Sequence, residues 1–381
     1  MTNEYSSSIR YIGVDDLDID LFESQYIVPE GMSYNSWVIL DDKVAVMDTA
    51  DGRKEKEWTA NLVATLNGRT PDYLICQHME PDHSAIIGKT MQEYPTLTLV
   101  CSQQTVKMLG FYFDLASFAE RIMVVKEGDT LPLGTHTLNF IAAPMVHWPE
   151  VMVTYDITYK TLFSADAFGT FGALNGAIFA DQVDFDRDYM DDARRYYTNI
   201  VGKYGPQTQA LLKKAAGLEI KTICPLHGPV LSTPDEIANA VTKYDIWSSY
   251  RVESPGVLVA YTSVYGNTKK AVFELENKLK QKGMTVVVHD LARSDMAENV
   301  EDAFRYSKIV FATTTYNSDI FPFMKEFVNH LTERNYSNRT VGFIENGTWA
   351  PLAAKIIKNM FEKSKNLTFC ENTVSIMSAM N

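Results

Sequence analysis

Apolar residues come in short runs through the first two thirds of the chain, separated by polar or Gly/Pro-bearing stretches. Short apolar or alternating runs predict strands, whereas apolar positions that recur with the helical period predict helices. The two runs on either side of Asp41-Asp42 predict a hairpin across that pair. The predicted strands of this region are 33–40, 43–48, 73–76, 96–101, 121–125, 137–142, 151–155, 161–164 and 221–224, and the predicted helices are 51–66, 186–201, 206–216 and 235–249.

The pattern changes after residues 250–256, which are polar and contain Pro and Gly. A fully apolar strand is followed there by a helix, and strands then alternate with helical segments. This rhythm is typical of βα units in a doubly wound parallel sheet. We therefore predict an α/β chain with one domain at 1–250 and a second, five-stranded domain at 251–381. The predicted strands of the second domain are 257–261, 285–289, 308–312, 340–344 and 373–376.

Composition and charge exclude several classes of protein. Of the 381 residues 46% are hydrophobic and 22% charged, which is ordinary for a globular chain with two cores. The formal net charge is -13 and no Lys/Arg cluster stands out, which argues against nucleic acid or an anionic membrane as the main partner. No apolar run approaches the length of a membrane span. Four cysteines in apolar contexts without CxxC pairing predict buried free thiols in a reducing cytoplasm. They are Cys76, Cys101, Cys224 and Cys370.

The stretch after the predicted strand 73–76 holds four potential metal ligands within six residues. The first two alternate along an extended backbone and therefore point the same way. The other two follow a proline and turn toward a second position, so the spacing suits two adjacent metals better than one. A lone histidine at a strand end is usually structural, but four ligand types together favour metal binding, and the proline argues against a charged helix face. The four are His78, Glu80, Asp82 and His83, and the proline is Pro81.

Three further ligand candidates, His147, Asp166 and His227, each come just after a β-like run. Each alone is weak, because polar residues at strand ends are commonly structural. Together with the opening cluster they repeat one pattern, a ligand at the C-terminal tip of a strand. The remaining histidines lack this placement, and we expect them to be structural or exposed. They are His136, His289 and His330.

In the second domain a loop of hydroxyl, Gly and amide groups joins the strand 257–261 to the helix 269–281. Such a loop before a helix N-terminus can hold phosphate through backbone N–H groups, hydroxyls and the helix dipole. It is neither GxxxxGK[ST] nor GxGxxG, so a nucleoside triphosphatase or a dinucleotide site is not expected. From this loop alone, an ordinary βα turn with a capping Thr268 is the alternative. The loop comprises Thr262, Ser263, Val264, Tyr265, Gly266, Asn267 and Thr268.

Two more loops of this domain, after the strands 308–312 and 340–344, carry hydroxyl, amide and aromatic side chains. A flavodoxin-like sheet binds FMN at its topological switch point, beside the C-terminal ends of its strands. The three loops therefore predict an FMN site. The two added loops contribute Thr313, Thr314, Thr315, Tyr316, Asn317, Asn346, Gly347, Thr348 and Trp349.

The ligand order HxExDH, then His, Asp and His, resembles the metallo-β-lactamase superfamily, an αββα sandwich with a dinuclear site. Zinc hydrolases of that superfamily carry HxHxDH, whereas this chain has Glu80 at the second histidine position. That replacement and TSVYGNT at 262–268 resemble the flavodiiron proteins, and an added anionic oxygen donor suits iron better than zinc. The resemblance implies one iron held by His78, Glu80 and His147, a second held by Asp82, His83 and His227, and Asp166 bridging the two.

The resemblance also implies a cytoplasmic enzyme that reduces O2 to water, NO to N2O, or both, at irons fed by FMN. The phosphate of FMN would be held by Ser263, Tyr265, Gly266, Asn267 and Thr268. Trp349 would stack on the flavin, with a surface anchor as the alternative. Family members place the FMN of one subunit against the irons of the other, so a head-to-tail homodimer or a tetramer is implied. The printed chain has no CxxC pair, so the electron donor would be separate, either rubredoxin or a reduced deazaflavin (F420).

Two alternatives stay open at this point. One is a dizinc hydrolase with a flavodoxin-like appendage, and the other is an electron-transfer or flavin-sensing module with a vestigial metal site. The preference between O2 and NO depends on residues near the irons, for which Trp148, Phe168 and Phe171 are candidates. After the strand 373–376 the last helix of a flavodoxin fold is lacking, and we expect that the chain is truncated there.

Overall fold

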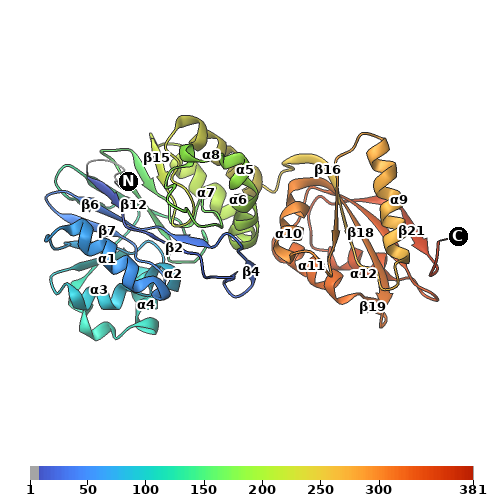
Figure 1. Cartoon of the computed structure of the whole chain (residues 1–381), viewed down its shortest axis with the longest axis horizontal. Coiled ribbons are helices and arrows are strands. Elements are labelled where there is room, and N and C mark those ends of the chain that lie inside the picture. Colours follow the sequence, from blue (N-terminus) through green and yellow to red (C-terminus); the bar gives the residue numbers. More distant parts are fainter. Residues whose placement is uncertain (1–7, 381) are drawn as a thin grey trace. The chain divides into compact units, whose positions relative to one another are not determined.

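A computed structural model describes residues 8–380, and these fall into two compact units (Figure 1). The first unit takes the chain up to Tyr196 and Pro206–Thr242. The second takes Tyr197–Gly205 and the chain from Lys243 onward. The predicted domain limits, 1–250 and 251–381, stay a prediction. Two stretches before residue 251 group with the second unit: the short segment Tyr197–Gly205 and the residues from Lys243 onward.

The first unit is built on two facing sheets. One has six strands in the order β1-β6-β7-β8-β9-β10, antiparallel from β1 to β7 and parallel from β7 to β10. The predicted hairpin across Asp41-Asp42 is confirmed, with Trp37 opposite Met47. The strands are β1 (Ile9–Tyr11), β6 (Trp37–Leu40), β7 (Val44–Met47), β8 (Tyr73–Ile75), β9 (Thr98–Ser102) and β10 (Ile122–Val125).

The other sheet has five strands in the order β11-β12-β13-β14-β15, antiparallel except for the parallel pair β14-β15. Trp37 of the first sheet meets Phe163 of this one with ring centroids 5.5 Å apart, so the two sheets share a core. The strands are β11 (Thr130–Pro132), β12 (Thr137–Ala142), β13 (Met152–Asp156), β14 (Thr161–Phe163) and β15 (Thr222–Cys224); two small sheets pair β2 (Val14–Asp16) with β5 (Met32–Tyr34) and β3 (Leu21–Phe22) with β4 (Tyr26–Ile27).

Helices cover both outer faces of the paired sheets, which gives the predicted αββα sandwich (Figure 1). The predicted helix 186–201 is wrong as a single element. It divides at Tyr189, whose backbone leaves the helical conformation, and it ends as a π-helix at Tyr197–Val201. The α-helices are α1 (Glu55–Leu66), α2 (Pro81–Ser84), α3 (Ile87–Glu93), α4 (Gln103–Tyr112), α5 (Phe185–Asp188), α6 (Met190–Tyr196), α7 (Gly205–Ala215) and α8 (Pro234–Ser248), the last of which runs into the second unit. Short 3-10 helices are η1 (Gly52–Lys54), η2 (Leu115–Ser117), η3 (Ala119–Arg121) and η4 (Ala180–Gln182).

The second unit is a parallel sheet in the order β17-β16-β18-β20-β21, as predicted for a flavodoxin-like fold. Alternate residues of β16 enter two cores: Leu258 packs with α10, α11 and α12, whereas Val259 packs with α9 on the opposite face. The elements are β16 (Ser254–Tyr261), α9 (Asn267–Gln281), β17 (Val286–Asp290), α10 (Met296–Arg305), β18 (Tyr306–Tyr316), β19 (Asp319–Ile320), α11 (Pro322–Glu333), β20 (Thr340–Asn346), α12 (Ala353–Met360) and β21 (Thr368–Ile376).

Two sequence-based expectations about this unit are corrected. Residues 313–316 are not a loop, because β18 continues to Tyr316 and turns back through Asn317 and Ser318 to pair with β19. Both turn residues have positive φ, 51° and 61°, which closes the tight reversal. Cys370 is exposed rather than buried, because β21 is an edge strand, whereas the other three cysteines are buried free thiols. No helix among residues 8–380 is long and apolar enough to cross a membrane.

Candidate metal centre and flavin pocket

The ligand loop begins where β8 ends, and its backbone is held from behind by buried groups. Asp48 accepts hydrogen bonds from the backbone N–H of Gln77 at 2.7 Å and from its side-chain amide at 2.8 Å. The carbonyl oxygen of His83 accepts from the hydroxyl of Thr49 at 2.6 Å. The second half of this loop is helical rather than extended, because Pro81 occupies the first position of α2, where proline is preorganised.

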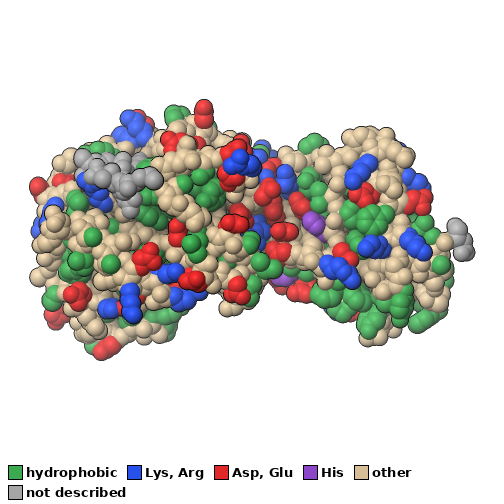
Figure 2. Space-filling model, viewed as in Figure 1, with side chains coloured by type: hydrophobic (Ala, Val, Ile, Leu, Met, Phe, Trp, Pro, Cys, Tyr) green, Lys and Arg blue, Asp and Glu red, His purple; other side chains and the backbone are tan. Residues whose placement is uncertain are grey.

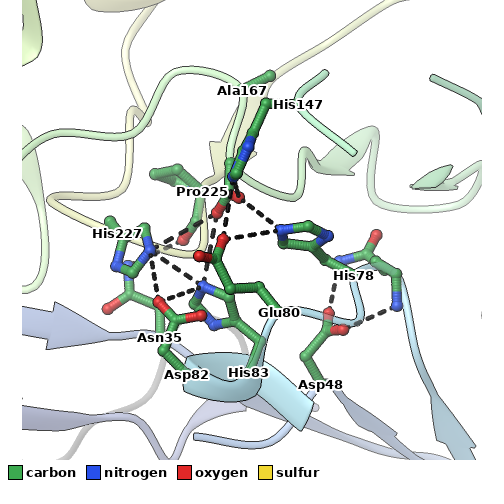
Figure 3. Close-up of polar contacts among 12 residues, drawn as sticks. Asn35, Asp48, His78, Glu80, Asp82, His83, His147, Ala167, Pro225 and His227 are labelled. Atoms are coloured by element: carbon green, nitrogen blue, oxygen red, sulfur yellow. Dashed lines mark hydrogen bonds and ion pairs between the residues drawn. The ribbon is translucent and has the colours of Figure 1, made fainter. Parts of the chain in front are cut away.

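The first ligand cluster consists of His78, Glu80, His147 and Asp166, one potential ligand atom of each lying within 4.8 Å of the others. Glu80 Oε2 is 3.2 Å from His78 Nε2 and 3.1 Å from His147 Nε2. Asp166 Oδ2 is 3.1 Å from each of the same two nitrogens. Figure 3 shows Glu80 pointing between the two imidazoles.

The second cluster consists of Asp82, His83 and His227. Asp82 Oδ2 is 3.3 Å from the Nε2 atoms of both histidines, and those two nitrogens are 3.0 Å apart (Figure 3). Asp166 turns its other oxygen, Oδ1, toward this cluster, 3.5 Å from His83 Nε2 and 3.6 Å from His227 Nε2. One carboxylate therefore faces both clusters, which is the placement of a bridging ligand.

The unbonded oxygens of these clusters fit metal cations. Both oxygens of Asp82 and of Asp166 are buried and have no hydrogen bond within the part of the chain described. A buried carboxylate oxygen without a hydrogen bond is costly. The Nε2 atoms of His83 and His227, 3.0 Å apart, share one proton in an N–H···N hydrogen bond, and both could bind a metal ion once that proton leaves. Two divalent ions would satisfy all of these atoms at once, and mixed imidazole and carboxylate donors suit iron.

Electrostatic interactions among the side chains of the first cluster shift their pKa values strongly. Burial lowers the pKa of His147, but the carboxylates of Asp166 and Glu80 beside its Nε2 outweigh this and raise the pKa to about 9. Burial likewise lowers the pKa of His78, yet Asp166 beside it raises that pKa well above the usual range. Burial raises the pKa of Asp166, but His78 and His147 hold it well below its ordinary value. The cluster is thus built to hold positive charge.

Aromatic rings surround the ligands. Among the predicted neighbours, Trp148 lies with its ring centroid 5.3 Å from that of His78, and Phe171 packs against Phe22 at 5.9 Å. Phe168 is buried with a φ of 67°. Three rings that contact His227 were not predicted from the sequence, because they lie far from it along the chain. They are Phe22, Tyr34 and Tyr196, at centroid distances of 5.5, 5.9 and 5.6 Å.

The three histidines predicted to be structural belong to neither cluster. His136 Nδ1 is 2.7 Å from Asp156 Oδ2, and His289 Nε2 is 2.7 Å from Asp302 Oδ2. His330 lies next to Arg334 on α11, and burial and that guanidinium lower its pKa.

In the second unit the three predicted loops surround a cavity of about 460 Å³. Gly266, at φ 87°, precedes α9, and Ser263 Oγ accepts from the backbone N–H of Lys269 at 3.2 Å. Figure 2 shows hydrophobic side chains gathered around β19, and large exposed ones at the cavity include Tyr265 and Trp349. The lining residues are Ser263, Val264, Tyr265, Asn267, Thr268, Thr314, Thr315, Tyr316, Asn317, Ser318, Asn346, Gly347, Thr348, Trp349, Ala350, Leu352 and Ser378.

Three of the predicted flavin residues, Thr262, Gly266 and Thr313, are not among those that line the cavity. Thr262 and Thr313 are buried, and their hydroxyl oxygens lie 2.6 Å apart, so this pair ties β16 to β18 beneath the pocket. Four lining residues were not predicted. Ser318, Ala350 and Leu352 directly extend the two predicted loops, whereas Ser378 follows β21 and reaches the pocket only in the tertiary structure.

Comparison with known proteins identifies both units. Residues 32–228 match the model of the ODP family beta lactamases. The chain belongs to this family. Residues 258–372 match a flavodoxin domain.

Full-length relatives share this two-part organisation. A nitric oxide reductase of Moorella thermoacetica is 29% identical over 94% of this chain and 89% of its own length. The flavodiiron protein of Giardia intestinalis superposes with a TM-score of 0.88, 25% identity, and coverage of 98% of this chain and 92% of that chain. The rubredoxin oxygen:oxidoreductase of Desulfovibrio gigas has the same fold, with a TM-score of 0.92, 24% identity, and coverage of 100% and 94%.

These matches confirm the predicted resemblance to the flavodiiron proteins and the predicted fold. They also confirm, for the family, the predicted cofactors, FMN and a non-haem diiron centre. They do not favour the dizinc hydrolase. The individual ligand and flavin-binding residues stay a prediction that the geometry above supports.

Proposed function

We propose that this protein is a flavodiiron oxidoreductase that reduces O2 to water, NO to N2O, or both. The observation that carries the proposal is the double cluster: seven ligand side chains form two groups, and one of the seven, Asp166, faces both groups. The same chain carries a flavodoxin-like pocket that suits FMN. Relatives named for nitric oxide reduction and for rubredoxin-dependent oxygen reduction support both substrates.

In this proposal His78, Glu80 and His147 would hold one iron and Asp82, His83 and His227 the other, while Asp166 would offer one oxygen to each side. Reduced FMN supplies two electrons and the two irons one each, which matches the four electrons that convert O2 to water. The chain's own contribution is placement, because the ligands come from rigid strand ends that buried neighbours hold. Asn35 illustrates this, because its amide donates to the carbonyls of Pro225 and Gly228 on either side of His227, at 2.8 and 2.7 Å.

The aromatic rings around His227 and His78 would exclude bulk water from the metals while admitting a small uncharged gas. Phe22 and Tyr34 contact His227, and Trp148 contacts His78. In the flavin pocket, Ser263 and the N-terminus of α9 would hold the phosphate. Trp349, at a strand-end loop of the pocket, would cover the flavin ring.

The assembly we propose is a head-to-tail homodimer, or a tetramer built from such dimers. The distribution of charge favours contact between the metal-binding portion of one subunit and the flavin-binding portion of the other over contact between two metal-binding portions. Residues 251–381 contain 16 Lys/Arg and 14 Asp/Glu, whereas residues 1–250 contain 19 Lys/Arg and 34 Asp/Glu. Two acidic metal-binding portions would repel each other, whereas an acidic and a slightly basic portion would not.

The proposed donor is rubredoxin or a reduced deazaflavin (F420), and the proposed location is the cytoplasm. A rubredoxin donor is supported by a relative named rubredoxin-oxygen oxidoreductase. The cytoplasm is supported by four cysteines that are free thiols, since a reducing compartment keeps them so.

The test is anaerobic stopped-flow of the iron-loaded, dithionite-reduced protein against O2 and NO separately, with products quantified. Flavin reoxidation by O2 without peroxide would identify an oxygen reductase. N2O from NO, with slow O2 turnover, would identify a nitric oxide reductase. If neither gas reoxidises the flavin and the metal is zinc, the proposal fails and the hydrolase alternative returns.

A further inference from the structure

A buried carboxylate outside the ligand set contacts the metal centre through one histidine. Glu150 lies three residues after His147, just before β13, and is only 2% exposed. Its Oε1 accepts a hydrogen bond from His78 Nδ1 at 2.8 Å and another from the backbone N–H of Met79 at 2.8 Å. Its backbone oxygen accepts from the hydroxyl of Ser102 at 3.1 Å, which fixes the residue at its other end.

Among the described residues, no carboxylate is paired with the Nδ1 atom of the other three proposed ligand histidines. His227 Nδ1 lies 2.6 Å from the backbone carbonyl oxygen of Ser33, which carries no net charge. His83 Nδ1 is buried without a hydrogen-bond partner within residues 8–380. The ion pairs of His147 with described carboxylates all run through Nε2. Both clusters offer two imidazoles, one carboxylate of their own and a share of Asp166. Glu23 also lies beside Glu80 and His147, but Glu150 is the described carboxylate that bonds a ligand imidazole at Nδ1.

The charge of Glu150 has no Lys or Arg side chain to balance it within the described part of the chain. There its one ion-pair partner is His78, and its Oε2 is buried with no hydrogen bond. A buried carboxylate is strongly destabilising unless a positive charge compensates it. A metal cation bound to His78 Nε2 would place a positive charge on the other side of the imidazole ring from Glu150. The carboxylate at Nδ1 in turn makes Nε2 a stronger ligand for that cation.

We propose that Glu150 is a positioning residue that makes the two iron positions unequal in reduction potential. It holds His78 with Nε2 facing the first cluster and stabilises the higher charge of a ferric ion there. When the diferrous centre loses one electron, that electron comes from the iron held by His78, Glu80 and His147, while the other iron stays ferrous. This inference rests on the proposed diiron function and adds an order of oxidation to it.

The test replaces Glu150 by glutamine, which keeps the hydrogen-bond acceptor and the shape but removes the charge. We expect the E150Q protein to retain two irons per chain. In a reductive titration followed by electron paramagnetic resonance, the half-reduced, mixed-valence form should be less stable. Outer-shell partners of metal ligands change metal affinity about 10- to 100-fold. A tenfold loss of affinity for the ferric ion alone would lower the comproportionation constant about tenfold, which is 59 mV for a one-electron couple.

Asp156→Asn is the matched control, because it removes the same kind of charge from the buried pair His136–Asp156, which belongs to neither ligand cluster. It should leave the mixed-valence signal and both potentials unchanged, even if the protein is less stable. If E150Q holds two irons with wild-type potentials, Glu150 is merely structural and the proposal is overturned.

Two further outcomes are decided separately. If E150Q cannot be loaded with iron, Glu150→Asp is measured in its place, because this variant keeps the negative charge. Wild-type reduction potentials in Glu150→Asp support the proposal, and altered reduction potentials overturn it. If the wild-type protein holds zinc and no reducible iron, the proposed function fails instead. The role of Glu150 is then judged by metal affinity, which E150Q must weaken about 10- to 100-fold at one of the two positions.

Discussion

Protons and metals compete for the same nitrogen atoms in the first ligand cluster. The carboxylates of Asp166 and Glu80 raise the pKa of His147 to about 9 despite its burial, so the metal-free imidazole is protonated at neutral pH. A metal binds only the neutral ring, and raising the pH toward 9 removes the competing proton. We expect the apparent affinity of chelator-treated protein for Fe(II) to rise about tenfold per pH unit for each proton displaced.

Iron-binding isotherms at pH values of about 6.5, 7.5 and 8.5, with proton release measured by calorimetry in two buffers, check this expectation. An affinity that does not change across this range would show that His147 gives up no proton, contrary to the charge balance of the cluster.

Trp349 offers a second test at the scale of one side chain. It lines the flavin cavity but is 87% exposed, so it contributes little to the folded core. Stacking on an aromatic ring contributes about 0.5–1.5 kcal/mol beyond area burial. Trp349→Ala should therefore weaken FMN binding about threefold to tenfold, measured by fluorescence titration of the deflavinated protein, and Trp349→Phe should largely restore it. Phe111→Ala, an equally exposed aromatic of α4, is the control. Unchanged FMN affinity in both tryptophan variants would mean that Trp349 is a surface anchor.

The turn after β15 shows how one element positions a ligand. Gly228 follows His227 with φ 80°, and a Cβ there would lie 2.5 Å from Thr170 Cγ2. Its N–H donates to Ser33 Oγ at 2.8 Å. Gly228→Ala must therefore shift this turn and His227 with it, at a cost of about 1–3 kcal/mol. We expect a lower Tm and the loss of up to one iron per chain.

Gly110→Ala provides the comparison for this variant. Gly110 lies within α4, has no positive φ, and a Cβ added there would meet nothing within 4 Å. Alanine at this position should therefore stabilise the helix by about 0.5–1 kcal/mol. Calorimetry and metal analysis on both variants separate the two effects. Full iron content in a folded Gly228→Ala protein would contradict the positioning role of the turn.

Elements also differ in how well local sequence predicted them. The first βα unit of the second unit was predicted closely, because the apolar run 257–261 and the helix 269–281 carry their own periodicity. The local sequence pattern gave the wrong secondary structure where an element depends on residues elsewhere in the chain or on its position in a helix. Asp82 and His83 lie on the one-turn helix α2, which proline begins rather than prevents. The polar residues 313–316 extend β18 because β20 and β19 offer backbone partners there.

At the scale of the whole molecule, the proposed head-to-tail dimer is the feature on which turnover would depend. If flavin and iron meet only between subunits, dilution below the dimer dissociation constant should leave both cofactors bound but abolish reduction of O2 or NO. Analytical ultracentrifugation paired with turnover assays at the same concentrations checks this. Activity that persists in a proven monomer would rule out the shared arrangement.

The sequence by itself determined the set of candidate groups: the seven side chains proposed to bind metal, the Glu80 that stands where zinc hydrolases carry a histidine, and the hydroxyl-rich loop proposed to hold phosphate after a parallel strand. Those features are local, since each ligand stands close to the end of a strand. Only the tertiary structure decided which groups surround them. Glu150 reaches His78 across 72 positions, and Phe22 packs on His227 although the two are far apart in the chain. Such contacts depend on how two sheets pack, and no local pattern encodes that packing.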